Sequence, residues 1–306
     1  MAHDFALSRG DLDSATYQRD EVDLAAELTF PNARVIVMDE GGRFAVTTGL
    51  AGTSLWLPPS QRVAGLQGDD PWRGWFLGRG QTGEPIVAVV APDEKVQPLL
   101  GGAKVSWADL TDFAPHLVDH RDSLLATQSA AIFAWQSRTR SCQLCGGPLR
   151  FRSGGWTAVC ARCGHIEYPR TDPAIIAAVT DPGDRLLLVH NVLWEPKRMS
   201  LPAGYVDAGE SVERAVQREM REEVSLEVAD LRYLGSQPWP RPRSLMLAFA
   251  ARTQDTRPVA DEVEVDRAHF FEREELVEKV ASQELVLPGP AAVAHTIIQS
   301  WLEEDL

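Results

Sequence analysis

Residues 204–226, GYVDAGESVERAVQREMREEVSL, combine five glutamates with three arginines, and the run REMREE holds most of this charge. Ser211 is a suitable N-cap because its hydroxyl can accept a hydrogen bond from a free backbone N–H. No helix breaker follows before about Val224. We therefore expect a helix whose carboxylates either form a solvated face or are held for chemistry, such as metal binding.

The direction in which the glutamates point separates these two possibilities. At about 100° per residue, Ala215, Val216 and Met220 define the apolar, buried arc of the helix. Glu219 and Glu223 fall in the middle of that arc. A solvated charge run would place its glutamates opposite the apolar residues, so the pattern favours carboxylates that face the body of the protein.

The remaining charges of the helix project elsewhere. Glu222 lies at the edge of the apolar arc, whereas Arg214, Arg218 and Arg221 lie on the other side, where they cannot neutralise the inward carboxylates. A buried carboxylate without compensation costs several kcal/mol. Clustered oxygen ligands without nearby His or Cys suit Mg²⁺ or Mn²⁺, which also bind phosphate oxygens. A helix that is merely acidic is the alternative.

The chain has four cysteines, and all of them lie in one window of 22 residues: Cys142, Cys145, Cys160 and Cys163. They form two C-x2-C pairs, which are followed by Gly146 and Gly164, residues that relieve the tight turn behind each pair. Four thiolates close the coordination sphere of Zn²⁺, so we expect a zinc ribbon with a structural ion. We interpret the ribbon as carrying few cations, which disfavours a nucleic-acid module.

Length and net charge limit the number of domains and the kinds of partner that the chain can have. A chain of 306 residues exceeds the usual domain size, so two or more compact units are expected. The net charge of -14 argues against a broad footprint for DNA or RNA. The first residues do not resemble a signal peptide, and no run of about 18 apolar residues occurs. We expect a soluble, cytoplasmic protein without membrane or DNA partners.

The chain pattern predicts four segments. Short β-rich runs between residues 30 and 92 predict a mainly β N-terminal domain: ARVIVMD, RFAVTT, SLWLPP, GWFLGRG and PIVAVVAP. Apolar residues at helical intervals then predict a connecting helix. The expected segments are an N-terminal domain over 1–115, this helix over 116–140, the zinc ribbon over 141–170 and a last domain over 171–306.

The last segment has the pattern of an α/β domain with helices packed on a sheet. AIIAAVT, RLLLVHNV and SLMLAFAAR read as buried strands, and PGPAAVAHTIIQSWLEE reads as a terminal helix. PAGYVDAG and the Pro-rich SQPWPRP are expected to be loops.

The charged helix and the residues around it resemble a known motif. Gly204, Glu210 and REMREE, followed by VSL, match the Nudix box G-x5-E-x7-R-E-U-x-E-E-x-G-U, where U is apolar. Ser225 replaces the last glycine. That glycine is expected to end the helix in a left-handed conformation, which a serine adopts at a cost of about 1 kcal/mol. No ligand is lost, and the resemblance implies an α/β/α sandwich.

A second motif narrows the resemblance. SQPWPRPRS, residues 236–244, resembles the S-Q-P-W-P-x-P-x-S signature of the NADH pyrophosphatase subfamily of Nudix hydrolases. That subfamily also carries a four-cysteine zinc ribbon just before its Nudix domain. The resemblance covers about residues 116–300, and the N-terminal domain is similar only in general terms.

The resemblance assigns roles to individual residues. It implies that a divalent cation is bound by four positions: the Ala203 carbonyl, Glu219, Glu223 and Glu264. Glu222, Glu223 or Glu264 would accept a proton from water, and Glu262 is near enough to be confused with Glu264. Glu210 and Arg218 resemble supporting residues, with Arg218 orienting a carboxylate of the box.

The implied substrate contacts lie in four places along the chain. They are Tyr168, Tyr205, Gln237, Pro238, Trp239, Pro240, Arg241, Pro242, Arg243, Ser244 and Ala294. Tyr168 and Tyr205 match aromatic positions that enclose a substrate ring, with ordinary packing as the alternative. Trp239, between two prolines, equally fits a role in loop architecture.

Three positions depart from the subfamily. Arg241 stands where Phe is common, which removes a stacking surface and adds a cation that could meet a phosphate. Pro59 and Gly155 occupy positions where a Lys and a Glu contact would be expected, so those contacts do not transfer.

The resemblance implies hydrolysis of the pyrophosphate of NADH or NAD⁺ to nicotinamide mononucleotide and AMP, together with removal of NAD caps from RNA 5′ ends. Recognition of the RNA body is expected to be weak because of the net charge. A homodimer is implied. Two alternatives are a Nudix hydrolase of ADP-ribose or another dinucleotide, and a catalytically dead NAD sensor or zinc-ribbon binding module.

Overall fold

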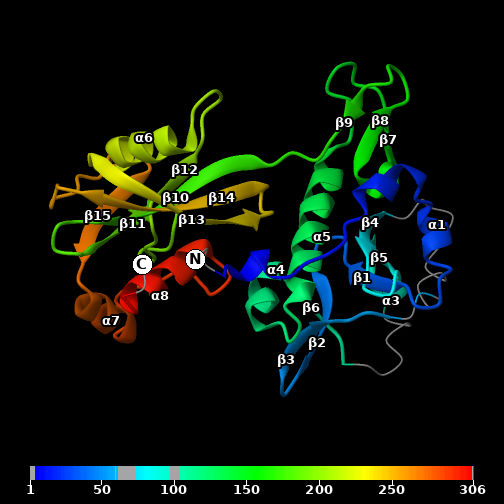
Figure 1. The fold of residues 1–306 in the computed structure, drawn as a ribbon, viewed down its shortest axis with the longest axis horizontal. Helices are drawn as coiled ribbons and strands as arrows, with labels where there is room; N and C mark the ends of the chain where they lie inside the picture. The colour runs from blue at the N-terminus through cyan, green and yellow to red at the C-terminus, as the bar shows by residue number, and fades with distance from the viewer. Residues whose placement is uncertain (1–3, 59, 61–72, 97–103, 305) are drawn as a thin grey trace. The chain divides into compact units, whose positions relative to one another are not determined.

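The computed structural model describes residues 4–58, 60, 73–96, 104–304 and 306 (Figure 1). The chain forms two compact units. One consists of Met1–Ser8, Thr171–Trp239 and Ser244–Leu306, and the other of Arg9–Arg170 and Pro240–Arg243. The segment ending at Ser8 and the short segment Pro240–Arg243 therefore each belong to the unit opposite to that expected from the sequence.

The unit Arg9–Arg170 is mainly β outside one long helix. Its elements are η2 (Thr16–Glu21), α1 (Leu24–Glu27), β1 (Arg34–Met38), β2 (Phe44–Gly49), β3 (Gly52–Leu55), β4 (Gly74–Arg79), β5 (Pro85–Val90), α3 (Asp93–Val96), β6 (Ser106–Ala108), α4 (Leu110–Phe113), η5 (Ala114–His116), α5 (Arg121–Arg138), β7 (Leu149–Arg152), η6 (Ser153–Gly155), β8 (Thr157–Cys160) and β9 (Ile166–Glu167). The first sheet has the order β3-β2-β1-β5-β4, with β6 paired to β2. The mainly β N-terminal domain is confirmed.

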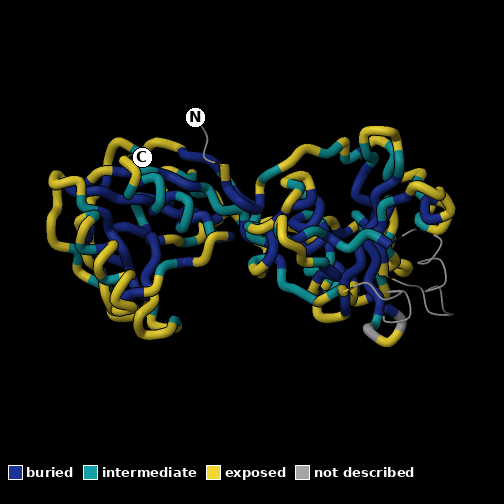
Figure 2. Tube along the Cα trace, turned by 90° about the horizontal axis from the view of Figure 1, so that it is seen from below, coloured by how far each residue is buried: buried dark blue, intermediate teal, exposed yellow. Residues whose placement is uncertain are grey.

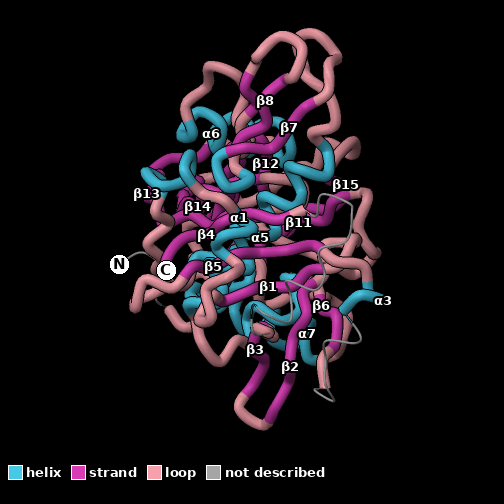
Figure 3. Tube along the Cα trace, turned by 90° about the vertical axis from the view of Figure 1, so that its right-hand side faces the viewer, coloured by secondary structure: helices cyan, strands magenta, loops and turns pink. Residues whose placement is uncertain are grey.

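The second sheet of this unit is small and carries the cysteines. β7, β8 and β9 pair antiparallel in that order. The cysteines lie in the segment before β7 and in the segment that begins at the end of β8, so both C-x2-C pairs are attached to the same short strands (Figure 3).

The other unit has a larger sheet. Its elements are η1 (Ala6–Ser8), β10 (Asp172–Thr180), β11 (Leu186–Asn191), β12 (Ala203–Tyr205), α6 (Val212–Val224), β13 (Val228–Trp239), β14 (Ser244–Thr253), β15 (Val265–Phe271), α7 (Arg273–Ala281) and α8 (Val293–Leu302). The strand order is β13-β14-β10-β11-β15, with β12 paired to β10. β10 and β14 are parallel, whereas β11 and β12 run antiparallel to β10.

Alternation along β10 produces cores on both faces of this sheet. Ile175 and Ala177 belong to the core cluster that includes Val216 of α6, whereas Ile176 belongs to the cluster that includes Ile297 of α8. Figure 1 shows α6 on one face and α7 and α8 on the other, and Figure 2 shows the buried strands between exposed loops. The α/β/α sandwich is confirmed.

The prediction that SQPWPRP forms a loop is wrong for its first part. β13 continues through Trp239, and Gln237 pairs with Met246 while Pro238 pairs with Leu245. β13 is an edge strand, where a proline without an N–H is tolerated.

Within the described residues, no helix combines the length and apolarity needed to cross a bilayer.

Candidate active site and zinc centre

Helix α6 begins and ends as its sequence predicts. The Ser211 hydroxyl accepts a hydrogen bond from the Arg214 N–H at 3.3 Å, and the helix runs to Val224. Ser225 adopts the left-handed conformation, with φ 56° and ψ 36°. Its N–H donates to the Arg221 carbonyl at 3.2 Å, which closes the last turn. The serine therefore takes the backbone role expected of the missing glycine.

Two glutamates of α6 are buried, in agreement with the helical projection. Glu219 is 9% exposed and Glu223 is 6% exposed. One carboxylate oxygen of Glu223, Oε2, has no hydrogen-bond partner among the described residues. Burial raises the pKa of Glu223 to about 8, and the negative charges of Glu219, Glu264 and Asp261 add to this rise. A bound cation would remove this penalty, so these residues fit a metal site.

The prediction that the arginines point away from the carboxylates is wrong for Arg218. Its Nη1 lies 2.8 Å from Glu219 Oε1 and 3.1 Å from Glu222 Oε2, and its Nε lies 3.0 Å from Glu210 Oε1. Nη2 donates to the Tyr205 carbonyl at 2.8 Å. The long side chain bends around the helix, which a projection from its Cα does not capture. Arg218 therefore orients box carboxylates and also holds β12.

Glycine at position 204 makes room for the Glu219 carboxylate. A Cβ on Gly204 would lie 2.1 Å from the carboxyl carbon of Glu219, far inside van der Waals contact. Strand β12, which contains Gly204 and the exposed Ala203, thus passes directly against this carboxylate. The glycine of the motif is explained by this close approach of backbone to side chain.

Glu264 is exposed and lies on a loop that is tied to the end of α6. The Asp261 N–H donates to the Glu223 carbonyl at 3.1 Å, and the Val259 N–H donates to the Val224 carbonyl at 2.9 Å. The Asp261 carboxylate accepts from the Glu264 N–H at 3.2 Å, so Asp261 shapes this loop. Sequence reasoning missed Asp261, although an aspartate that caps nearby N–H groups is a common loop signal.

The glutamates are neighbours without being in ligand contact. Among the described residues, the four cysteines form the one group of three or more candidate ligands whose atoms all lie within 4.8 Å. Glu219, Glu223 and Glu264 interact electrostatically. Their metal-binding roles stay a prediction.

The four cysteines converge in a way that suits zinc. The Sγ atoms lie 3.7 Å apart for Cys142 and Cys163, 3.5 Å for Cys145 and Cys160, and 3.4 Å for Cys145 and Cys163. A tetrahedral Zn²⁺ with bonds of about 2.3 Å separates its sulfurs by about 3.8 Å. Both glycines behind the pairs have positive φ, 67° and 74°. The cluster is therefore compatible with a zinc ribbon.

Two predicted substrate contacts have side chains that are unavailable to a ligand. Gln237 is fully buried, and its amide accepts from the Leu7 N–H and donates to the Ala291 carbonyl, both at 3.0 Å. Ala294 belongs to α8, is 2% exposed, and has its methyl group in the core. Long-range packing thus occupies both side chains, and the substrate-binding roles of these two residues stay predictions.

Among the other predicted contacts, the two tyrosines are accessible, whereas Pro240 and Ser244 are buried. Tyr168 is 59% exposed and Tyr205 is 50% exposed. The Tyr205 hydroxyl lies 3.3 Å from the hydroxyl of Ser244, which is buried at the start of β14. Pro238 and Trp239 are half-buried at the end of β13. Their substrate-binding roles stay predictions.

Arg241 does not offer a free cation. Its Nη2 lies 2.5 Å from Asp109 Oδ1, and the neighbouring Pro242 carbonyl accepts a hydrogen bond from Arg138 at 3.3 Å. Pro240, Arg241, Pro242 and Arg243 all belong to the unit Arg9–Arg170. The expectation that Arg241 meets a phosphate is therefore not supported, since its charge is already paired.

Gly155 and Pro59 stand where the resemblance would place a Glu and a Lys contact. A Cβ on Gly155 would lie 2.7 Å from Trp75 Cβ, so no glutamate fits at this position. Pro59 lies outside the described residues.

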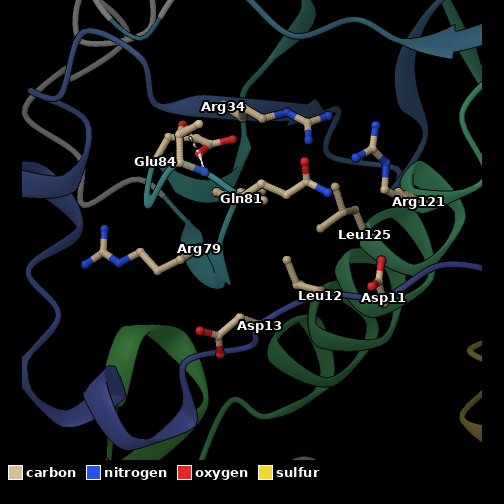
Figure 4. A pocket seen from close by; sticks show the side chains of 12 residues that line it. Asp11, Leu12, Asp13, Arg34, Arg79, Gln81, Glu84, Arg121 and Leu125 are labelled. Atoms are coloured by element: carbon tan, nitrogen blue, oxygen red, sulfur yellow. Dashed lines mark hydrogen bonds between the residues drawn. The ribbon is translucent and has the colours of Figure 1, made fainter.

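A cavity of about 680 Å³ in the unit Arg9–Arg170 is lined by no predicted site residue (Figure 4).

The sandwich, with its buried glutamates on one helix, defines the class of the protein. Residues 170–288 match the NUDIX domain family. The chain is 36% identical over 310 residues to a protein of Mycobacterium bovis (strain BCG / Pasteur 1173P2) named NAD-capped RNA hydrolase NudC, with 96% of this chain and 94% of that protein covered. This is a Nudix hydrolase, and it belongs to the NudC family.

Two further similarities cover part of the chain. A Pongo abelii protein named NAD-capped RNA hydrolase NUDT12 is 32% identical over 194 residues, covering 60% of this chain and 42% of that protein. A crystal structure of a Nudix hydrolase from Nitrosomonas europaea has a TM-score of 0.43 and 20% identity, covering 54% of this chain and 91% of that one.

Proposed function

We propose that this chain hydrolyses the pyrophosphate bond of NAD(H) to NMN(H) and AMP, and that it removes NAD caps from RNA 5′ ends by the same cut. The observation that carries the proposal is the buried carboxylate of Glu223, which has an unpartnered oxygen and lies beside Glu219. Such a group needs a cation, and a hard cation bound to carboxylates can also bind the phosphate oxygens of a pyrophosphate. The names of the relatives support the NAD-containing substrate.

The proposed cation is Mg²⁺ or Mn²⁺, held by Glu219, Glu223, Glu264 and the Ala203 carbonyl. When bound, it would neutralise the pyrophosphate and lower the pKa of a coordinated water. The oxygen-only donor set fits both ions. Burial of Glu219 and Glu223 keeps competing water away from these carboxylates.

In the hydrolysis, a water oxygen forms a bond to phosphorus while the bond from that phosphorus to the bridging oxygen breaks. Glu222, Glu223 or Glu264 accepts the proton of the water. Arg218 holds Glu219 and Glu222 in fixed positions through contacts of 2.8 and 3.1 Å. Positioning of this kind reduces the reorganisation that the reaction requires.

The exposed rings are proposed to contact the substrate. Tyr205, fixed by its hydroxyl against Ser244, is proposed to present its exposed aromatic face to a nucleobase or nicotinamide. Tyr168, which is exposed in the other unit, is a separate proposed contact. The zinc is proposed to be structural, because four thiolates leave no open coordination position. We also propose a homodimer, as the resemblance implies, which sedimentation velocity tests directly.

The decisive experiment incubates the purified chain with NADH, NAD⁺, ADP-ribose and NAD-capped RNA in Mg²⁺ or Mn²⁺, and resolves the products by chromatography. AMP and NMNH are expected from NADH, and NMN and 5′-monophosphate RNA from the capped RNA. Glu223→Gln should be inactive, whereas Glu213→Gln, an exposed residue of the same helix, should retain activity. No AMP from NADH, or full activity of Glu223→Gln, would refute the proposal.

A further inference from the structure

The zinc ribbon and its flanks are cationic in an otherwise acidic chain. Residues 138–170 contain six arginines: Arg138, Arg140, Arg150, Arg152, Arg162 and Arg170. The segment has one acidic residue, Glu167, which is 2% exposed, while the whole chain has a net charge of -14. A Zn²⁺ with four thiolates adds about two negative charges, which leaves the segment positive. The expectation that the ribbon carries few cations is therefore wrong.

These six arginines are also available to a ligand. All six are exposed, and in the part of the chain that the structure describes none forms an ion pair with a carboxylate. Their hydrogen bonds go to neutral oxygens, as Arg162 donates to the Cys145 carbonyl at 3.0 Å and Arg170 to the Gln143 amide oxygen at 3.2 Å. Their charge is thus not neutralised within the protein.

The arginines around the cavity of Figure 4 make a useful contrast. Each is paired with an acidic side chain: Arg79 with Glu27 at 2.6 Å, Arg34 with Asp122 at 3.1 Å and Arg121 with Asp119 at 2.7 Å. An anion that entered this cavity would compete with those carboxylates. The cavity is therefore a poorer anion site than the ribbon, although both contain arginines.

Two of the ribbon arginines lie on one face of the small sheet. Arg150 and Arg152 are two residues apart on β7, so their side chains leave the same face. Arg150 lies opposite Val159, which in turn lies opposite Ile166 of β9, and Ile166 is 42% exposed. Side chains opposite each other on antiparallel strands share a face. This face thus combines cations with a row of partly exposed apolar side chains.

We infer that this face of the ribbon, formed by Arg150, Arg152, Val159 and Ile166, binds the sugar-phosphate backbone of the single-stranded RNA that follows an NAD cap. The inference rests on the proposed function for the choice of RNA as the polyanion. Arginine guanidinium groups bind phosphates bidentately, and the apolar row offers contact to sugars and bases. The positive segment also offsets the repulsion that an acidic protein exerts on RNA.

The expected contribution follows from counterion release. For single-stranded nucleic acid, each phosphate contact contributes about 0.7 to the slope of log affinity against log salt, or about fivefold in affinity at 0.1 M salt. Removing two contacts should weaken binding about 25-fold and reduce the slope by about 1.4. Free NAD has no RNA backbone, so its hydrolysis should not change.

The test compares the double variant Arg150→Gln, Arg152→Gln with a charge-matched control, Arg232→Gln, Arg252→Gln. The control residues are exposed and lie on β13 and β14. Binding of a fluorescent, 5′-monophosphorylated single-stranded RNA of about 12 nucleotides is measured by anisotropy without added divalent ion, over a salt series. The ribbon variant should bind the RNA about 25-fold more weakly, and its slope of log affinity against log salt should be smaller by about 1.4. The control variant should change neither quantity.

A second variant and a second readout keep the outcomes distinct. Arg150→Lys, Arg152→Lys keeps the charge and should retain most of the RNA affinity, and zinc content reports that the ribbon is intact. Equal affinity in the glutamine variant and the wild type, or equal losses in the lysine and glutamine variants, would overturn the inference. Binding of uncapped RNA requires no hydrolysis, so a chain that fails to cleave NAD refutes the proposed function and leaves this measurement interpretable.

Discussion

Replacing Glu223 by glutamine should stabilise the metal-free protein while it abolishes activity. The side chain is 6% exposed and has one unpartnered oxygen. Glutamine has nearly the same shape and carries no charge, so it removes the electrostatic cost of the buried carboxylate without leaving a cavity. An increase in stability that accompanies a loss of function is typical of a residue held for chemistry.

The magnitude follows from the pKa of Glu223, which burial raises from an ordinary 4.5 to about 8. Between these values the folded state binds more protons than the unfolded state, so stability falls as pH rises. At pH 7 the ionisation of Glu223 lowers the free energy of unfolding by about 3 kcal/mol. This loss vanishes below the pKa that the group has in the unfolded state. Glu223→Gln should therefore raise the free energy of unfolding by about 3 kcal/mol at pH 7 and by almost nothing at about pH 4.

The assay is thermal unfolding over a pH series, in buffers without added divalent ions and without chelators that would remove zinc. A gain of about 6–12 °C is expected for Glu223→Gln near pH 7. Millimolar Mn²⁺ should stabilise the wild type by about 3 kcal/mol at a hundredfold excess over its Kd, but not this variant. Glu222→Gln is the control, because Glu222 is 63% exposed and should change stability by less than about 1 kcal/mol.

Two results would refute this reasoning. If Glu223→Gln is no more stable than the wild type at pH 7 in metal-free buffer, the carboxylate is compensated in solution. If its stability gain is the same at pH 4 and pH 7, the gain has a cause other than the ionisation of Glu223.

Further predictions concern the surroundings of these carboxylates. Gly204→Ala should lower kcat/KM for NADH at least about tenfold with an unchanged circular dichroism spectrum, because its Cβ would lie 2.1 Å from the Glu219 carboxyl carbon; an unchanged kcat/KM would contradict the close approach. Arg218→Ala should lose about 3 kcal/mol in urea unfolding, since several carboxylates lose their shared partner, whereas Arg214→Ala should change by less than about 0.5 kcal/mol. Ser225→Gly should gain about 1 kcal/mol in the same assay at constant kcat, because its φ of 56° is unstrained only for glycine; a loss would show that the serine is not strained.

The helix, its inward carboxylates and the zinc ligands could be predicted from the sequence because each depends on spacing along one segment. Ser211 and Ser225 bound the helix, and about 3.6 residues per turn determines which side Glu219 and Glu223 occupy. Likewise, each C-x2-C pair with its glycine forms a local turn.

Contacts between distant segments could not be predicted in this way. The Gln237 amide is bonded to the Leu7 N–H, 230 residues away in the chain, and no local pattern reveals that its side chain is buried. Asp261 reaches the end of α6 only because β15 and the loop before it are brought there by the sheet. Arg241 likewise contacts Asp109, which is 132 residues away.

The sequence by itself thus determined which residue types could bind zinc and a hard cation, since motif spacing and helical period are local properties. The tertiary structure decided which charges remain uncompensated. Arg218 bends back to three carboxylates, while Glu223 is left with an unpartnered oxygen. Burial and partners depend on packing between strands and helices far apart in the chain, and this packing separates the supporting glutamates from the one that most needs a cation.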